Sequence, residues 1–260
     1  MHERERHRII LSEAATKPVV TISYLVELLD ASEATIRRDV NFLHNEGKLR
    51  KVRGGAESLH PPTSTGLAGR PFAISQSINA KAKSRVAQAA AALCTEGESI
   101  IIGGGSTAFM MAEHIKHMQL DVMTNSFVIA EYLLREGNCN VTVPSGKIYR
   151  EQNLILSPYP EDGSSQFYAS KMFFGAQGVG NLGVMETDPQ IVQGTTRLLG
   201  QAEQRILLID SSKFTLSSSM ITCSLAALDT VVTDQGVSNK SIKMIEASGC
   251  RLIIAGESSV

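Results

Sequence analysis

Residues 32–39 have the sequence Ser-Glu-Ala-Thr-Ile-Arg-Arg-Asp, and this stretch decides the fold of the first part of the chain. Ser32 is a residue type that begins helices, because its side-chain oxygen accepts a hydrogen bond from a backbone N–H of the first turn. Ile36, Val40 and Leu43 follow at helical spacing and form one apolar stripe. The pattern predicts a short, capped helix with one buried face.

The opposite face of this helix is polar and carries positive charge. Thr35 lies in its first turn, and Arg37, Arg38 and Asn41 point away from the apolar stripe. A small helix with a polar N-terminal turn and two arginines suits the major groove of DNA. The alternative is a solvated amphipathic helix followed by a charged loop. These four residues and Ser32 are therefore candidate DNA contacts.

The flanking residues predict the rest of a winged helix-turn-helix. Apolar residues at helical spacing predict helices over 3–16 and 23–29, with a short turn before the third helix. Three short helices over about forty residues match the size of this motif. Gly47 ends the third helix, and residues 47–56 predict a two-stranded wing. The candidates for contacts to phosphates or the minor groove are Lys48, Arg50, Lys51 and Arg53.

Positive charge is concentrated in this region although the whole chain has a net charge of −1. Residues 37–53 hold six basic and two acidic side chains, a local charge of +4, and a local basic face is the feature expected of a DNA-binding protein. The chain resembles the N-terminal domain of DeoR-family repressors in the motifs Ser32-x-x-Thr35-Ile36-Arg37-Arg38-Asp39, Gly47-Lys48-Leu49 and Arg53-Gly54-Gly55-Ala56. This resemblance implies a transcriptional repressor that binds a double-stranded operator.

Length and composition predict two domains in a cytoplasmic protein. The chain has 260 residues, of which 43% are hydrophobic, enough for a sizeable core. Its apolar runs are too short to span a membrane, and no apolar signal segment follows the charged N-terminus. Four scattered cysteines fit reduced thiols. Turn-forming residues predict a linker at 58–78, between a DNA-binding domain at 1–57 and a sensor domain at 79–260.

The sensor domain is expected to be an α/β domain, because short apolar runs alternate with helical patterns. Strands are expected at 99–102, 120–123, 140–143, 171–174, 206–209, 230–233 and 251–254, and helices at 79–93, 107–117, 127–135, 191–203 and 237–247. Such alternation predicts a largely parallel sheet covered by helices. Ligands of such sheets bind at the carboxyl ends of the strands.

Small polar loops follow three of the expected strands. Residues 103–107 read Gly-Gly-Gly-Ser-Thr, residues 124–126 read Thr-Asn-Ser, and residues 210–213 read Asp-Ser-Ser-Lys. Glycine backbone N–H groups, a helix N-terminus and a cation all favour an anion, so the loops together predict a phosphate-sized site. A single loop of this kind could equally be an ordinary tight turn. The loops contribute the candidates Gly104, Gly105, Ser106, Thr107, Thr124, Asn125, Ser126 and Lys213.

These loops resemble the effector domain of the same DeoR family, which is similar in fold to ribose-5-phosphate isomerase and glucosamine-6-phosphate deaminase. The resemblance implies a phosphorylated sugar or sugar-derived effector. Gln177 lies in a segment that matches the family's, and Gly146 lies in Pro144-Ser145-Gly146, which stands where the family usually has Gly-Gly. Arg150 lies in a polar stretch that either contacts the sugar or is a solvated loop. The first loop is also similar to ascorbate-utilisation repressors, and residues 69–72 and 149–153 to rhizobial repressors of the agrocinopine catabolism type. That likeness implies an opine-derived or pentose phosphate.

Two departures from the family pattern bear on catalysis. Gly103 and Gln177 stand where acidic residues are usual, and neither can titrate. An aldose–ketose isomerase needs a positioned base, so the substitutions favour binding without turnover. The competing interpretation is a sugar-phosphate isomerase or deaminase fused to a DNA-binding domain. It stays open because Glu186 and Asp188 are nearby in the sequence.

Other motifs predict neither a cofactor nor a metal. Residues 178–183 fit the pattern GxGxxG, but no helical pattern opens at the third glycine, as a dinucleotide site requires. His114 and His117 share a helix face but have no third ligand of suitable type nearby.

The DNA target bears on the oligomeric state. Paired DNA half-sites demand symmetry, so we expect a homodimer or homotetramer. The linker is expected to transmit the effector signal.

Overall fold

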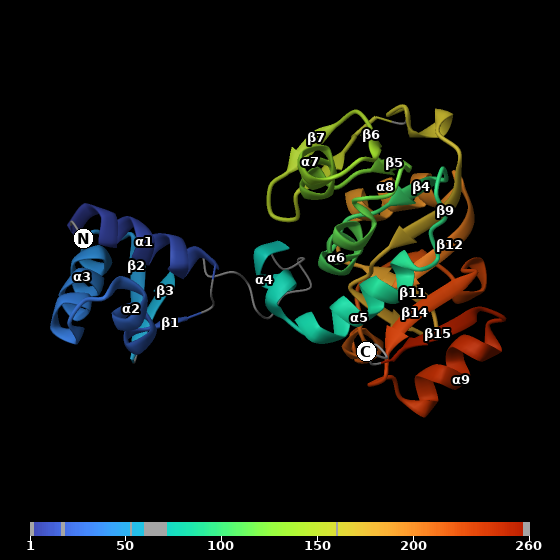
Figure 1. Ribbon diagram of the computed structural model, residues 1–260. Coiled ribbons are helices and arrows are strands. Elements are labelled where there is room, and N and C mark those ends of the chain that lie inside the picture. The colour runs from blue at the N-terminus through green and yellow to red at the C-terminus, as the bar shows by residue number, and fades with distance from the viewer. Residues whose placement is uncertain (1–2, 17–18, 53, 60–71, 160, 257–260) are drawn as a thin grey trace. The chain divides into compact units, whose positions relative to one another are not determined.

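The computed structural model describes residues 3–16, 19–52, 54–59, 72–159 and 161–256 (Figure 1). The chain forms two compact units, Met1–Ile74 and Ser75–Val260, each of which is described by itself. None of the helices in these described ranges combines the length and apolar character that crossing a bilayer requires.

The first unit is a winged helix-turn-helix, as expected. Its helices are α1 (Glu3–Thr16), α2 (Ile22–Leu29) and α3 (Glu33–Asn45), and its strands β1 (Val20–Thr21), β2 (Leu49–Val52) and β3 (Gly55–Ser58) pair antiparallel in the order β1-β3-β2. The predicted stripe forms the centre of the core, where Ile36, Val40 and Leu43 pack with Ile10 and Leu25.

Local interactions fix the start of α3 and the position of the wing. Ser32 Oγ accepts a hydrogen bond from the backbone N–H of Thr35 at 3.2 Å, which caps α3 as the sequence predicts. Gly54 has a φ of +79° at the turn between β2 and β3. At Gly55 an added Cβ would lie 2.2 Å from the carbonyl oxygen of Val20, so β1 and β3 can approach this closely only because residue 55 is glycine.

The second unit contains a seven-stranded sheet in the order β15-β14-β12-β9-β4-β5-β6, with every neighbouring pair parallel. The strands are β4 (Ser99–Ile102), β5 (Asp121–Thr124), β6 (Asn140–Thr142), β9 (Ala169–Phe174), β12 (Ala202–Leu208), β14 (Thr230–Asp234) and β15 (Arg251–Ala255). This arrangement confirms the expected α/β class.

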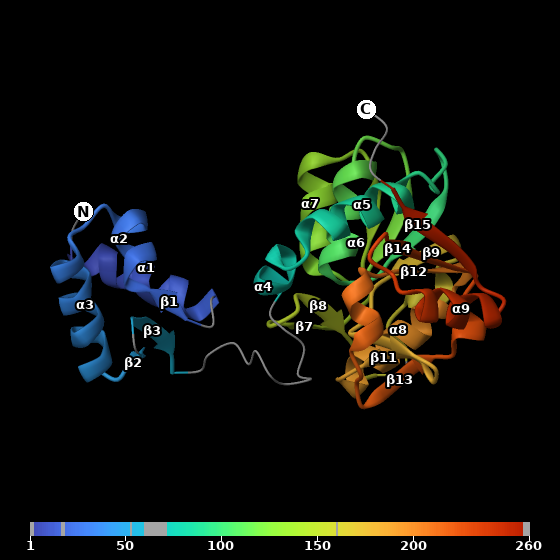
Figure 2. The same ribbon diagram turned by 90° about the horizontal axis from the view of Figure 1, so that it is seen from below.

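Helices cover both faces of this sheet (Figure 2). On one face Ile100 and Ile102 pack in a core with α5 (Ala80–Ala91), α6 (Ser106–Ile115) and α7 (Phe127–Glu136). On the other face Ile101 packs in a second core with α8 (Pro189–Leu199) and α9 (Asn239–Ala247). Because side chains alternate along a strand, three consecutive isoleucines serve both cores.

Several smaller elements complete the second unit. A hairpin of β7 (Lys147–Tyr149) and β8 (Leu154–Leu156), and a sheet of β10 (Gly178–Gly180), β11 (Gly183–Glu186) and β13 (Met220–Cys223), are antiparallel. The remaining elements are α4 (Phe72–Ser77) and the short 3-10 helices Ser164–Gln166, Ser211–Thr215 and Leu225–Ala227.

The structure differs from the sequence-based expectation at the end of one helix. The helix expected at 191–203 ends at Leu199, because Gly200 follows it and residues 202–203 begin β12. The segment expected as linker contains α4, and residues 60–71 lie outside the described residues. Residues 178–183 form the β10–β11 hairpin, so the third glycine opens a strand and provides no helix N-terminus for a pyrophosphate.

Candidate DNA interface and strand-end loops

The structure places the candidate DNA contacts of α3 on one accessible face. Ser32, Arg37, Arg38 and Asn41 are exposed, and Thr35 is half-buried in the first turn. Their positions on the face opposite the core follow from the helical spacing of the apolar stripe. The first turn and the two arginines are therefore open to a partner.

Acidic neighbours partly neutralise this cationic surface. Arg37 pairs with Glu33 one helical turn earlier, with 2.6 Å between Nη2 and Oε1. On the wing, Arg50 pairs with Glu57 at 3.2 Å. Likewise, Lys48 lies 3.6 Å from Glu46, Lys51 is exposed on β2, and Arg53 lies outside the described residues. Exposed pairs of this kind are weak, so a DNA phosphate can replace the carboxylate.

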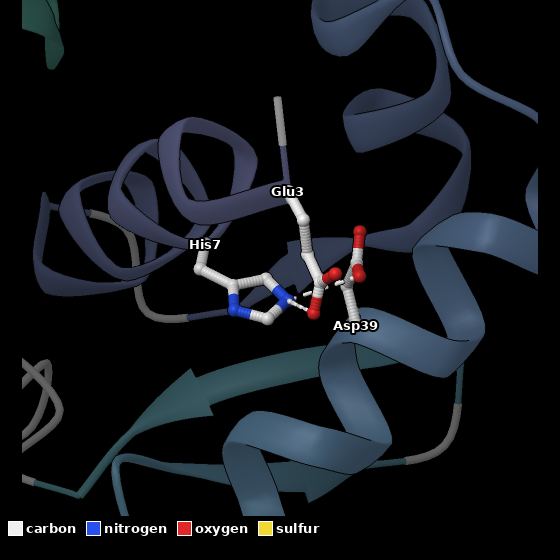
Figure 3. Close-up of side chains that lie close together, drawn as sticks. All are labelled: Glu3, His7 and Asp39. Atoms are coloured by element: carbon white, nitrogen blue, oxygen red, sulfur yellow. Dashed lines mark hydrogen bonds and ion pairs between the residues drawn. The ribbon is translucent and has the colours of Figure 1, made fainter. Parts of the chain in front are cut away.

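A cluster of Glu3, Arg6, His7 and the buried Asp39 holds α3 against α1 (Figure 3 shows three of its members). Asp39 Oδ2 accepts a hydrogen bond from Arg6 Nε at 2.8 Å, and Asp39 Oδ1 lies 3.0 Å from His7 Nε2. Burial raises the pKa of Asp39, but the hydrogen bonds from Arg6 and His7 outweigh it and keep that pKa below its ordinary value. His7 also stacks on Phe42, with 5.1 Å between the ring centroids.

This cluster also has metal-ligand spacing, because single ligand atoms of Glu3, His7 and Asp39 lie within 4.8 Å of one another. Both carboxylate oxygens of Asp39 already have donors, one of them the permanently charged Arg6 guanidinium. A cation next to that guanidinium would be repelled, so we interpret the cluster as a structural contact between helices.

The three polar loops lie at the same edge of the large sheet. Residues 103–107 follow β4, residues 124–126 follow β5 and residues 210–213 follow β12, and these strands run in one direction. We call these segments the strand-end loops. The chain winds outward in opposite directions from β4 and β9, which are neighbours in the sheet. The loops therefore surround a topological switch point, where ligands of parallel sheets bind.

The first strand-end loop presents the start of α6 to open space. Gly105 precedes α6 with a φ of +124°, and a Cβ added there would meet no atom within 4 Å. Within the described residues no side chain caps α6, so the N–H groups of its first turn are available to an anion. Ser106 and Thr107 are buried in that turn and add hydroxyl groups.

The hairpin of β7 and β8 is joined to the second strand-end loop. The backbone N–H of Ile155 donates to the carbonyl of Asn125 at 2.7 Å, and Ser126 forms a bridge with Leu154. A Cβ at Gly104 would lie 2.1 Å from Leu154 Cδ2, so the hairpin also covers the first strand-end loop closely. Two predicted effector residues, Gly146 and Arg150, belong to the hairpin segment and not to the strand ends.

Buried polar atoms in the second loop lack partners in the described structure. Asn125 is 3% exposed and Ser126 is 1% exposed, yet Asn125 Oδ1 and Ser126 Oγ have no hydrogen-bond partner. Thr124 is satisfied differently, because its Oγ1 accepts a hydrogen bond from the N–H of Ser126 at 3.0 Å. Buried polar groups nearly always have partners, so these two atoms are candidates for contact with a ligand.

A buried acid lies beside the third strand-end loop. Burial raises the pKa of Glu186 to about 7, although the N–H of Thr187 and the charge of Lys213 lower it. The N–H of Gln177 donates to the carbonyl of Met185 at 3.1 Å, which brings that predicted residue next to Glu186, and its backbone also lowers the pKa of Glu186. The sequence marked Glu186 only as an acid close along the chain, because the β11 position that buries it was not predicted.

A winged helix with a cationic recognition face and a parallel α/β unit with polar strand ends define a two-domain transcription regulator with a sensor domain. Two family models match these units: the DeoR-like helix-turn-helix domain over residues 6–62 and the DeoR C terminal sensor domain over residues 78–235. The chain belongs to the DeoR family of DNA-binding transcription regulators. The resemblance found in the sequence is thereby confirmed.

Relatives that match over nearly their whole length are named HTH-type transcriptional regulators. The chain is 32% identical over 254 residues to the HTH-type transcriptional regulator UlaR of Shigella dysenteriae serotype 1 (strain Sd197), covering 97% of this chain and 99% of that protein. The identity and coverage are the same for UlaR of Escherichia coli O1:K1 / APEC. Among solved structures, ribose 5-phosphate isomerase A from Methanocaldococcus jannaschii matches with a TM-score of 0.38 and 19% identity over 52% of this chain and 55% of its own. The present chain therefore spans about half the length of that structure.

Proposed function

We propose that this protein is a transcriptional repressor of a carbohydrate or opine catabolic operon, released from its operator by a phosphorylated sugar or sugar-derived effector. The observation that carries the effector half is the meeting of three strand-end loops at one switch point. They combine the open N-terminus of α6, the unpaired atoms of Asn125 and Ser126, and the cation of Lys213. Such donors and a single cation suit a phosphate with attached hydroxyl groups.

The effector half is tested by thermal-shift measurements on the full chain with a panel of sugar phosphates. A ligand at 100 times its Kd stabilises a protein by about 2.7 kcal/mol, so a specific effector gives a clear shift. We expect the shift to be lost in Lys213→Ala and kept in Lys243→Ala, which removes an exposed lysine on α9. A shift that survives Lys213→Ala, or the lack of any shift in the wild type, would contradict the proposal.

The DNA half assigns base contacts to α3 and backbone contacts to the wing. Ser32, Thr35, Arg37, Arg38 and Asn41 occupy the accessible face of α3 and reach base edges in the major groove. The remaining candidates, Lys48, Arg50, Lys51 and Arg53, contact phosphates or the minor groove. A symmetric operator requires a homodimer or homotetramer, assembled through the sensor domain.

The two roles are separable by binding to a duplex that the wild-type protein selects from random sequence. Arg38→Ala is expected to weaken binding by about 1–3 kcal/mol and to relax sequence preference at one position. Lys51→Ala is expected to weaken binding to all sequences alike and to lower the slope of log K against log salt by about 1. Identical effects of the two variants would refute this division.

A second candidate function is a sugar-phosphate isomerase-like activity, and one observation favours it. The pKa of Glu186 is about 7, a value suited to a general base, and Lys213 is close enough to lower it. Gly103 and Gln177 count against this candidate, because they replace the titratable groups expected at those positions. Incubation of the panel with the protein, followed by NMR of the products, distinguishes turnover from binding.

A further inference from the structure

Asn79 joins the start of α5 to the third strand-end loop across 131 positions of sequence. Its Nδ2 donates a hydrogen bond to Asp210 Oδ1 at 2.8 Å and another to Ser212 Oγ at 3.1 Å. Asp210 is 2% exposed, and the same carboxylate oxygen accepts the backbone N–H of Ser212 at 3.2 Å. The Asn79 amide therefore takes part in the network that shapes the loop carrying Lys213.

The backbone of Asn79 shows that this contact is made at the expense of a helix cap. Asparagine at the residue before a helix ordinarily has an extended backbone, and its side chain accepts a hydrogen bond from the first turn. Asn79 instead has a left-handed backbone, with φ +55° and ψ +30°, and makes no such cap in the described structure. A left-handed residue other than glycine costs free energy, of order 1 kcal/mol. In the described structure Asn79 therefore contacts the third strand-end loop instead of capping α5.

The same turn holds α4, the last element before the sensor domain. Ser77 ends α4 two residues before Asn79, and Lys83 in the first turn of α5 donates from Nζ to the carbonyl of Ser75 at 2.5 Å. Lys83 is only 5% exposed. The direction in which the chain enters α5 therefore depends on the backbone conformation of Asn79.

We propose that Asn79 is the positioning residue that carries effector occupancy to α4, an inference that rests on the proposed function. A phosphate bound at the third strand-end loop accepts the hydroxyl hydrogen of Ser212, which otherwise goes to Asp210 Oδ1, and so draws Ser212 Oγ away from Asn79 Nδ2. Asn79 then changes to an extended backbone and caps α5, which redirects α4. The observed arrangement uses Nδ2 of Asn79 as a donor and the capped one uses Oδ1 as an acceptor, so each satisfies one end of the amide and a modest ligand preference can shift the balance between them.

The test is hydrogen exchange measured by mass spectrometry on the full chain, with and without a probe. The probes are inorganic phosphate and the panel member that gives the largest Lys213-dependent thermal shift. In the wild type we expect a bound probe to slow hydrogen exchange in peptides over 103–109. In peptides over 72–83 we expect the exchange rate to change about tenfold, as for the gain or loss of one net hydrogen bond. Asn79→Gly keeps the left-handed backbone but lacks the amide. It should keep the response at 103–109 and lose the response at 72–83.

Two further variants complete the experiment. Asn79→Asp tolerates the left-handed backbone but places a carboxylate against Asp210, so peptides over 72–83 should show the ligand-bound exchange rate without a probe. Asn138→Gly removes another hydrogen bond of a side-chain amide, the one that Asn138 Nδ2 donates to the carbonyl of His117 at 3.3 Å, and this variant should behave as the wild type.

The outcomes separate this inference from the function on which it rests. If 72–83 responds equally in wild type and Asn79→Gly, or does not respond in the wild type while 103–109 does, the role of Asn79 is wrong and the effector site stands. If no probe changes exchange at 103–109 in the wild type, the proposed effector function itself is overturned.

Discussion

The buried carboxyl of Glu186 gives the sharpest quantitative prediction, for the variant Glu186→Gln. Glu186 is 8% exposed, and burial raises its pKa from 4.5 to about 7. Because the folded protein holds this proton more tightly than the unfolded chain, the associated stability is fully present below pH 4.5 and is lost as pH rises to about 7. At about 1.36 kcal/mol per pH unit, the loss amounts to about 3 kcal/mol.

Glutamine is neutral at every pH and avoids this loss. Glu186→Gln should therefore match the wild type near pH 4.5 and exceed its free energy of unfolding by up to about 3 kcal/mol near pH 8. Urea unfolding followed by circular dichroism across this pH range measures the difference in the free energy of unfolding between the variant and the wild type. The DNA-binding unit is the same in both proteins, so its contribution cancels from this difference. Glu246→Gln, which changes an exposed residue of α9, is the control and should show no such divergence.

The reasoning would be refuted if the two curves ran parallel from pH 4.5 to about 8. It would be refuted equally if the variant were less stable at high pH, because the charged carboxylate would then be stabilised by its surroundings. The comparison needs no effector, so it tests the electrostatics of the strand-end loops separately from ligand binding.

Three changes in the DNA-binding unit, each measured by thermal unfolding and by DNA affinity, test its construction. Asp39→Asn should lower the unfolding temperature of the unit, because it leaves Arg6 and His7 without their carboxylate; unchanged stability would contradict a structural role. Ser32→Ala should cost about 1 kcal/mol through loss of the cap of α3, and an effect on DNA affinity alone would argue against capping. Gly55→Ala should cost about 2 kcal/mol, since the new methyl group meets the Val20 carbonyl, and a neutral result would mean that β1 can move aside.

Signals that lie close together in the sequence predicted the recognition unit well. The helix expected at 3–16 is α1, and the cap at Ser32 and the stripe of Ile36, Val40 and Leu43 are found as expected. Capping and helical spacing act within one or two turns, so the sequence contains the whole signal. The strands of the parallel sheet are nearly continuous apolar runs and were predictable for the same reason.

Features that depend on distant contacts were not predictable. Asp39 reads as one acid among the basic residues of α3, and only the fold brings Arg6, which is 33 positions away, against it. The hairpin that covers Gly104 consists of two three-residue strands, too short for a periodic signal. Asn79 and Asp210 meet only when the sheet has assembled. Local patterns thus identified the strand ends but not the residues that connect them to the rest of the molecule.

The ion pairs on the recognition surface have a consequence for how a regulator finds its site on a chromosome. Arg37, Lys48 and Arg50 each have a carboxylate neighbour before DNA arrives. A basic side chain that must leave a carboxylate to meet a phosphate gives a smaller net release of counterions, the term that drives binding to random sequence. Binding to the large excess of unrelated sites is therefore weakened more than binding to a site that also offers matching base edges. On the proposed function, Glu33, Glu46 and Glu57 would in this way shorten the time that the protein stays bound at each unrelated DNA site and speed its search for the operator.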